Sequence, residues 1–140
     1  MTPTAAYRTE HPKHLAFHLP IFPVPLSACF VNVARNGRAD SARYAAWKRT
    51  TDAFLAKNLA GWLGNPWKPT FSEKVKVTIL LEAPDRHRRD LDNCLKGLGD
   101  LLQRNHILGD DSQIVHWDIR WTYPKEDLAL PVYITISEVE

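Results

Sequence analysis

The sequence Asp90-Leu91-Asp92-Asn93-Cys94-Leu95-Lys96 joins two segments that differ in hydrophobic period. Before it, apolar side chains recur at every second position of residues 75–81, which is typical of a β-strand over about 74–82. After it, leucines three or four positions apart predict a helix over about 91–104: Leu91, Leu95, Leu98 and Leu102. Two carboxylates therefore stand where a loop becomes the N-terminus of a helix.

A second acidic junction follows the predicted helix, in the turn Leu108-Gly109-Asp110-Asp111. We expect the carboxylates of the two junctions to converge at one edge of a sheet, in the arrangement that a hard divalent cation requires. Within the helix, Asp92, Lys96 and Asp100 are four residues apart and should share one polar stripe.

The same acidic residues have a structural interpretation, which the spacing alone supports about equally well. Asp90 and Asp92 could cap the helix, a contribution of ~0.3–1 kcal/mol. Asp92 and Lys96 are in the favourable orientation for an ion pair across one helical turn, worth ~0.2–0.5 kcal/mol. Asp110 and Asp111 could simply form a solvated turn.

The spacing narrows the kind of metal site that these aspartates could form. An EF-hand is excluded, because the sixth residue counted from Asp90 is Leu95 instead of glycine and the twelfth is Leu101 instead of glutamate. Mg²⁺ fits better, because it takes few carboxylates, keeps several waters and completes its shell with phosphate oxygens.

The bulk composition is that of a soluble protein. The 140 residues predict one domain, residues 1–140, with a flexible tail over 1–13. No apolar run approaches the ~20 residues of a membrane span, and residues 1–12 have no apolar stretch of the kind found in secretory signals. Cys29 and Cys94 have neither metal-binding nor disulfide spacing, so we expect a reducing cytoplasmic environment.

Positive charge is concentrated in the first part of the chain. Residues 1–109 contain 16 Lys and Arg against 9 Asp and Glu, a balance of +7, whereas residues 110–140 contain 2 against 7, a balance of −5. Such asymmetry favours a polyanionic partner. A charge run such as 86–89 is more commonly a solvated loop, but this run adjoins a helix N-terminus, which attracts phosphate. The residues assigned to DNA binding are Arg86, Arg88, Arg89, Arg35, Arg38, Lys48, Lys74 and Lys76.

The remaining segments complete an α+β pattern. Further strands are expected over 14–19, 30–33, 115–121 and 130–139. Asn36-Gly37 predicts a hairpin turn, and a helix should run from the N-cap Ser41 to about Ala60, with Gly61 ending it. The expected fold is a mixed β-sheet with two main helices packed on one face. The other face, which is partly apolar, is a candidate oligomer interface.

Aromatic residues accompany the first predicted helix and the connection that follows it. We assign Tyr44 and Trp47 to the core, and leave Phe30 open between the core and a base-stacking role. Trp62 and Trp67 should pin the connection over 61–72. The histidines show no metal-binding spacing and receive no role.

The stretch APDRHRRDLDNCLKGLGDLLQRNHILGDDSQIV, residues 83–115, closely resembles the RusA-type Holliday-junction resolvases, endodeoxyribonucleases of which many are encoded by phages and prophages. The likeness consists of a basic run, the sequence DLDN, a lysine four residues after its second aspartate, and a turn that reads GDDSQI. It covers about a quarter of the chain closely, and most of the predicted elements more loosely. The chain departs from the family at Pro23-Val24-Pro25-Leu26-Ser27-Ala28-Cys29. The family often has an asparagine after the serine of this segment, and this chain does not. The segment bears on substrate preference.

The resemblance implies a RusA-like homodimer that uses Mg²⁺, or Mn²⁺ in its place, to nick two opposing strands of a four-way DNA junction in recombination and repair. The family's catalytic and metal-binding carboxylates match Asp90, Asp92 and Asp111, and its catalytic lysine matches Lys96. Two other functions stay open: a branched-DNA-binding protein without catalysis, and a Mg²⁺-dependent phosphohydrolase of small molecules. Three converging acids favour the nuclease, because they would repel phosphate unless a metal ion were present.

Overall fold

The computed structural model describes residues 13–35, 37–82, 91–122 and 130–139. The predicted tail up to residue 12, and the basic loop with Arg86, Arg88, Arg89 and Asp90, lie outside these residues. No helix among the described residues is both long and apolar enough to cross a bilayer. The elements are β1 (His14–Leu19), η1 (Leu26–Ala28), β2 (Phe30–Val33), β3 (Gly37–Asp40), α1 (Ala42–Asn58), β4 (Val75–Leu81), η2 (Leu91–Cys94), α2 (Leu95–Arg104), η3 (Asp111–Gln113), β5 (Ile114–Trp121) and β6 (Val132–Glu138).

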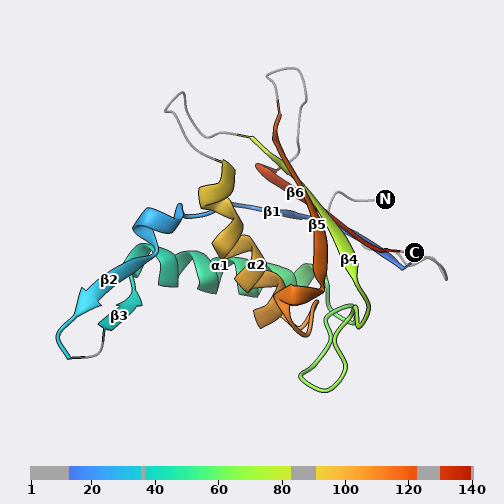
Figure 1. Cartoon of the computed structure of the whole chain (residues 1–140), viewed down its shortest axis with the longest axis horizontal. Coiled ribbons are helices and arrows are strands. Elements are labelled where there is room, and N and C mark those ends of the chain that lie inside the picture. Colours follow the sequence, from blue (N-terminus) through green and yellow to red (C-terminus); the bar gives the residue numbers. More distant parts are fainter. Residues whose placement is uncertain (1–12, 36, 83–90, 123–129, 140) are drawn as a thin grey trace.

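The main sheet has the strand order β1-β6-β4-β5. β6 runs antiparallel to both of its neighbours, whereas β4 and β5 are parallel, from Val75 beside Ile114 to Leu81 beside Trp121. Parallel neighbours need a crossover connection, and the segment that contains α2 provides it. Figure 1 shows α1 and α2 on the same side of this sheet. The prediction of an α+β fold with a mixed sheet and two helices is confirmed.

One face of the sheet forms the core together with the two helices. In β4 the buried residues alternate with half-buried ones, as the sequence predicts: Val75, Val77, Ile79 and Leu81 are buried. α2 covers this face with Leu98, Leu101 and Leu102, none of which is exposed to solvent. Because burial of a leucine side chain contributes ~1.5–3 kcal/mol, these contacts hold α2 against the sheet.

The helix predicted over 91–104 has two parts. Residues Leu91–Cys94 form the 3-10 helix η2, and the α-helix begins only at Leu95. Leu91 and Leu95 are half-buried, whereas the later leucines of the predicted stripe are fully buried. A 3-10 helix has three residues per turn instead of 3.6, so side chains before Leu95 do not continue the stripes of α2.

α1 begins and ends close to the predicted positions. The Oγ atom of its N-cap, Ser41, accepts a hydrogen bond from the backbone nitrogen of Tyr44 at 3.1 Å and donates one to the carbonyl of Ala28 at 2.7 Å. The helix ends at Asn58, and Gly61 has a φ of +85°, a conformation that glycine adopts without strain. The predicted apolar stripe is largely buried, at Tyr44, Trp47, Thr51, Leu55 and Leu59.

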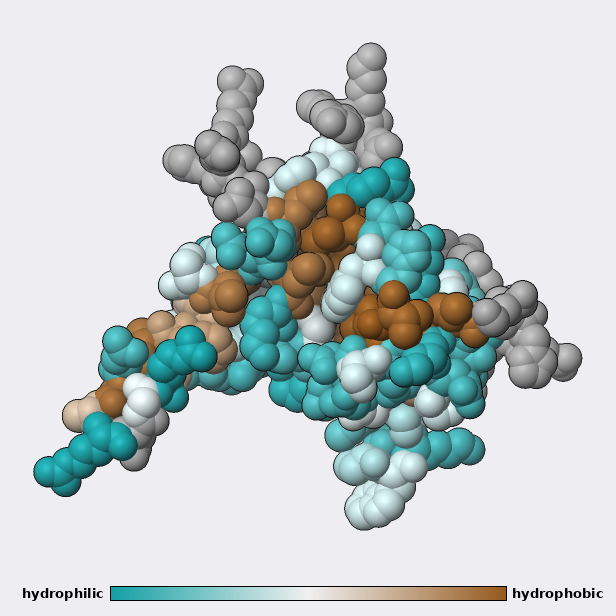
Figure 2. Space-filling model, viewed as in Figure 1, coloured by the Kyte–Doolittle hydropathy of each residue, from teal (hydrophilic) through white to brown (hydrophobic). Residues whose placement is uncertain are grey.

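β2 and β3 form a hairpin that projects from the body of the molecule (Figures 1 and 2). Gly37 has a φ of +75°, in agreement with the predicted turn, while Asn36 lies outside the described residues. At its base, the Phe30 ring lies 5.7 Å from the Tyr44 ring, edge to face, and the Arg38 guanidinium lies 4.8 Å from the Phe30 centroid. Phe30 therefore packs at the margin of the core.

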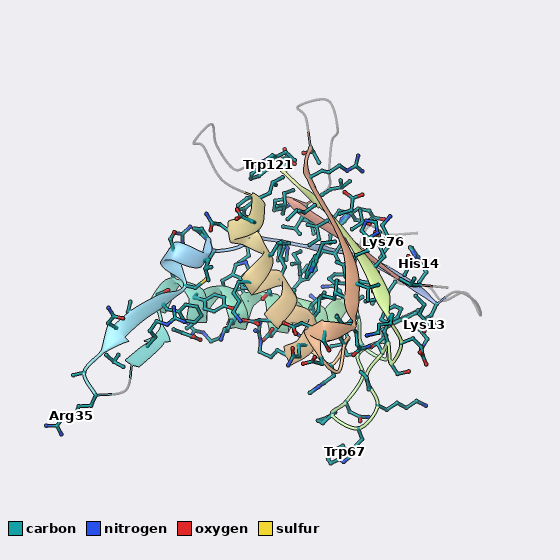
Figure 3. The ribbon with its side chains drawn as sticks, in the orientation of Figure 1. Lys13, His14, Arg35, Trp67, Lys76 and Trp121 are labelled. Carbon is teal, nitrogen blue, oxygen red and sulfur yellow. The ribbon has the colours of Figure 1, made fainter. Side chains whose placement is uncertain are left out.

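Two segments depart from the sequence prediction. In β1 every residue from Leu15 to Leu19 is buried instead of every second one. On the face of the strand opposite Leu15, Phe17 and Leu19, the His18 ring lies 4.7 Å from the Tyr133 ring. In the connection 61–72, Trp62 packs against the core as expected, but Trp67 is 90% exposed (Figure 3). Only one of the two tryptophans therefore pins this connection.

An ion pair joins α1 to the last turn of α2. Arg104 donates to both carboxylate oxygens of Asp52 at 2.9–3.2 Å, and Asn105 Nδ2 donates to Asp52 Oδ1 at 3.0 Å. Burial alone would raise the pKa of Asp52, but the hydrogen bonds from Arg104 and Asn105 outweigh it, so the pKa lies below its usual value. The ionised carboxylate therefore stabilises the packing of the two helices.

We predict that Asp52→Asn lowers the free energy of unfolding by about 1 kcal/mol near pH 7, a small value because the Asp52 side chain is 35% exposed and solvent screens the pair. Since folding lowers this pKa, the contribution is complete above the unfolded-state value of about 3.9 and is lost as the pH falls through the folded-state value. The difference in melting temperature between wild type and variant should therefore shrink below about pH 4. A constant difference from neutral pH to pH 3 would contradict an ionic contribution.

Candidate active site

The polar residues of segment 91–104 lie away from the buried leucines of α2. Asp92 and Lys96 are exposed, and Asp100 is half-buried. Lys96 Nζ lies 3.3 Å from Asp100 Oδ1, and the Tyr44 hydroxyl donates to Asp100 Oδ2 at 3.2 Å. Asp100 thus connects a core tyrosine of α1 to the exposed lysine of α2 and orients its ammonium group.

The structural interpretation of the acidic residues included an ion pair between Asp92 and Lys96, and no such pair is present among the described residues. Lys96 pairs with Asp100, one turn further along α2. Asp92 belongs to the 3-10 helix η2, so the spacing of an α-helical i,i+4 pair does not apply between it and Lys96. The Lys96 side chain is 49% exposed, so its pair with Asp100 contributes little to stability and acts mainly on the position of the ammonium group.

Tyr44 belongs to the core, as predicted, but its hydroxyl belongs to this site. Burial, followed by the charge of Asp100 and the hydrogen bond to it, raises the pKa of Tyr44. The phenol therefore stays protonated at neutral pH and remains a donor to Asp100. The sequence carried a partial signal for this arrangement, because Asp100 stands four residues after Lys96, but nothing in it pairs Asp100 with Tyr44.

The acidic turn before β5 is held by Gln113. Its Oε1 atom accepts from the backbone nitrogens of Gly109 at 2.8 Å and Asp110 at 3.1 Å, and its Nε2 atom donates to the carbonyls of Phe71 and Glu73, both at 2.9 Å. A glutamine three residues after an aspartate is a capping-box signature, so the sequence held a signal for this role of Gln113 that was missed.

The two neighbouring aspartates of this turn have different environments. The Asp110 carboxylate is the N-cap of η3 and accepts from the backbone nitrogen of Ser112 at 3.1 Å, and hydrogen bonding to Ser112 lowers its pKa. Asp111 is exposed, and its backbone nitrogen donates to Gln103 Oε1 at 3.2 Å. The geometry gives Asp110 a structural role and leaves the carboxylate of Asp111 facing solvent beside the last turn of α2.

The predicted convergence of Asp92 and Asp111 at one sheet edge is wrong within a single chain. Because β4 and β5 are parallel, the end of β4 and the start of β5 lie at opposite ends of the sheet. Asp92 precedes the first residue of α2. The backbone nitrogen of Asp111 donates a hydrogen bond to the side chain of Gln103, in the last turn of α2. The ten residues of α2 span about 15 Å, so the two aspartates lie at opposite ends of the helix.

The donor set has the chemistry that Mg²⁺ prefers, because the aspartates supply carboxylate oxygens. Within residues 13–35, 37–82, 91–122 and 130–139, however, no three His, Cys, Asp or Glu residues gather in a group that could hold a metal ion. Asp90, the third predicted ligand, lies outside the described residues. The three aspartates therefore do not form a complete metal site within the described part of one chain.

The predicted DNA-binding residues that the structure describes do not form one patch. Arg35 and Arg38 lie on the projecting hairpin, whereas Lys76 lies on β4, on the opposite side of the molecule (Figure 3). Lys74 is exposed just before β4. Lys48 pairs with Asp40 at 2.6 Å and, with Asp100, Gln103 and Arg104, lines a polar hollow of about 310 Å³ beside the candidate site.

A comparison with protein families matches residues 20–137 to the family described as Endodeoxyribonuclease RusA. The matched region contains every candidate site residue: Asp90, Asp92, Lys96 and Asp111. No curated protein matches the chain. Because the family match spans most of the 140 residues, from the segment after β1 into β6, the chain belongs to the RusA endodeoxyribonuclease family.

Proposed function

We propose that this protein is a Mg²⁺-dependent, structure-selective endonuclease that resolves four-way DNA junctions by paired, symmetric nicks. The RusA family is one of endodeoxyribonucleases that resolve Holliday junctions, which supports a nuclease acting on branched DNA. The observation that carries the proposal is the exposed pair Asp92 and Lys96 at the start of α2, with Lys96 oriented by Asp100. A carboxylate and an oriented cation, both open to solvent, suit a phosphodiester substrate.

The metal ion is proposed to be held by Asp90 and Asp92, and Mn²⁺ could replace Mg²⁺. Asp111, which matches the family's third catalytic carboxylate, lies at the other end of α2 within one chain. Mg²⁺ commonly takes one or two carboxylates and fills its remaining positions with water and phosphate oxygens. When bound, such an ion polarises the scissile phosphate and favours deprotonation of the attacking water.

Lys96 is proposed to stabilise the negative charge that develops on the phosphate in the transition state. Its ammonium group is a compact cation, and the side chain is 49% exposed, so DNA can approach it. The neutral Tyr44 hydroxyl keeps Asp100 in place, and Asp100 in turn limits the directions in which Lys96 can point. The pre-oriented lysine then needs little rearrangement when the substrate arrives.

DNA affinity is proposed to come from basic residues that contact phosphates without reading bases. Arg86, Arg88 and Arg89 directly precede the catalytic aspartates in sequence, and Arg35 and Arg38 project on the hairpin. Lys48, beside the candidate site, and Lys74 and Lys76, at β4, are assigned to further phosphate contacts. Their spread over several sides of the molecule fits a branched substrate better than a single straight duplex.

A junction-binding protein without catalysis is the second candidate. It would need the basic residues but would gain nothing from an exposed lysine oriented by a carboxylate and a buried phenol. A small-molecule phosphohydrolase needs an enclosed pocket, whereas Asp92, Lys96 and Asp111 are all exposed. Both observations favour the nuclease.

We predict that Asp90→Asn, Asp92→Asn and Asp111→Asn each abolish nicking of a synthetic four-way junction in Mg²⁺ while binding stays equal or becomes tighter. Each substitution removes a negative charge. That charge would hold the metal ion, and without the metal it repels the phosphates of DNA. Asp110→Asn is the matched control, because asparagine is also a good N-cap and preserves the turn, so nicking should change little. Near wild-type nicking by the three test variants would remove these aspartates from the proposed site.

We predict that Lys96→Ala reduces nicking at saturating Mg²⁺ by ~10²–10³-fold, the usual effect of losing one group that stabilises a transition state. The melting temperature should hardly change, because an exposed ion pair on a helix contributes only ~0.2–0.5 kcal/mol. Asp100→Asn keeps an acceptor for Tyr44 but loses the charge that orients Lys96, so its nicking should lie between those of wild type and Lys96→Ala. A lowered melting temperature with normal nicking would make the Lys96–Asp100 pair purely structural.

We predict a homodimer in solution with or without Mg²⁺, because paired nicks on a two-fold symmetric junction need two symmetric sites. Light scattering at micromolar concentration measures the mass directly. A monomer that still makes paired incisions would contradict this proposal.

A further inference from the structure

One tryptophan of this chain is left in solvent. Trp67 is 90% exposed, whereas the other four tryptophans are buried or half-buried: Trp47, Trp62, Trp117 and Trp121. Figure 3 shows the Trp67 side chain at the tip of the loop between α1 and β4, directed away from the body of the molecule. A large flat apolar ring in water forgoes the stabilisation that burial would give it. Packing of the free chain therefore does not explain this ring.

The backbone that carries this ring forms a tight turn over residues 64–68, which we call the tryptophan turn. The Asn65 Oδ1 atom accepts hydrogen bonds from the backbone nitrogens of Trp67 and Lys68, both at 2.9 Å. Asn65 and Lys68 also pair through their backbone groups, at 3.0 and 3.1 Å. Pro66 fixes the φ angle in the middle of the turn. Because this backbone is already held in place, a ligand that binds the ring pays little for ordering it.

The tryptophan turn is anchored to the segment that follows α2. The backbone nitrogen of Thr70 donates to the carbonyl of His106 at 2.9 Å, and that of Phe71 donates to the carbonyl of Ile107 at 2.9 Å. The two sides of the loop also meet closely at Gly64, where a Cβ atom would lie 2.5–2.6 Å from backbone atoms of the opposite side and of the segment after α2. The turn is therefore fixed to the body of the molecule at its base.

This anchoring places the tryptophan turn beside the acidic turn. A Cβ atom on Gly109 would lie 3.5 Å from Pro69 Cγ, and Gln113 joins the two segments, since it accepts from the Gly109 backbone nitrogen and donates to the carbonyl of Phe71. Pro69 is two residues after the ring, and Asp111 is two residues after Gly109. The Cα atoms of the tryptophan and of Asp111 are therefore no more than about 22 Å apart, or six to seven base-pair steps. A DNA strand bound at Asp111 has the ring within a few base pairs.

The chemistry of the turn fits a nucleic-acid base better than a protein surface. Lys68, next to Trp67, is exposed and supplies a cation for a phosphate, and residues 61–72 contain no acidic residue. A stable protein partner covers roughly 800 Å² on each side of an interface, whereas the ring is flanked in the turn only by Asn65, Pro66 and Lys68. A single exposed aromatic ring matches the flat face of one base, and such stacking is a common way of holding unpaired nucleotides.

We infer that Trp67 stacks on a base that has lost its stacking neighbour at the branch point of the DNA, while Lys68 binds an adjacent phosphate. This inference rests on the proposed function and adds a contact that distinguishes branched from linear DNA. Phosphate contacts hold any DNA, whatever its shape. A stacking contact is gained only where the face of a base is open, and the interior of a duplex offers no such face.

The first test measures binding in EDTA, so that no strand is cut. The two ligands are a synthetic four-way junction and a relaxed, covalently closed duplex circle, which has neither ends nor a branch. Trp67→Ala should raise the Kd for the junction by roughly 5- to 150-fold, the usual effect of losing one stacked base, and the Kd for the circle by less than about twofold. The melting temperature should not change, because truncation of a 90% exposed ring leaves no cavity. An unchanged Kd for the junction, or equal weakening on both DNAs, would overturn the inference.

Two further substitutions separate stacking from a general apolar contact. Trp67→Phe keeps a flat ring and should retain most of the affinity for the junction, whereas Trp67→Leu keeps an apolar side chain without a flat face and should resemble Trp67→Ala. Equal losses in the phenylalanine and leucine variants would contradict stacking. Val139→Ala is the matched control for the loss of an exposed apolar side chain, because Val139 is 45% exposed and lies outside both turns, so its affinity should equal that of wild type.

A cross-linking experiment locates the contact in the wild-type protein. 5-Iodouracil replaces thymine either at the branch point or in the middle of one arm, and the irradiated complexes are digested and identified by mass spectrometry. The branch-point label should join the peptide that contains Trp67. A label that joins this peptide equally from the arm, or joins other peptides only, would contradict the inference.

The possible failures can be told apart. Wild-type protein that binds neither DNA would refute the proposed function itself, whereas wild type that prefers the junction, together with Trp67→Ala that binds it as tightly, refutes only the stacking role. Light scattering separates a third outcome. If Trp67→Ala has a smaller mass than wild type, the ring belongs to a contact between copies of the chain and the inference is wrong.

Discussion

Parallel hydrogen bonding between β4 and β5 fixes the positions of most other elements. Two parallel neighbours cannot be joined by a tight turn, so the chain must return along the sheet before it starts the second strand. α2 makes this return, and its buried leucines, Leu98, Leu101 and Leu102, pack on the apolar face of β4. The polar side of the same helix is therefore turned outward, and this places Lys96 in solvent and Asp100 within reach of Tyr44.

The parts of the fold that depend on local sequence could be predicted. The alternation of residues 75–81, the N-cap Ser41 and the glycine of the hairpin turn each act within a few residues, and each lies where expected. The orientation of β5 relative to β4 could not be predicted in this way, because a period of two is the same in parallel and antiparallel strands. That one unknown decided whether the two acidic junctions meet or lie apart.

The candidate site shows the same division between local and long-range information. The motif that contains Asp92 and Lys96 was identified from the sequence, and both residues are exposed near the start of α2. The spacing left both Asp92 and Asp100 as possible partners of Lys96, because the sequence did not reveal that Asp92 lies in a 3-10 turn before α2. The hydroxyl of Tyr44 was missed because it comes from α1, more than fifty residues away, and a residue of the core was not expected to reach the site.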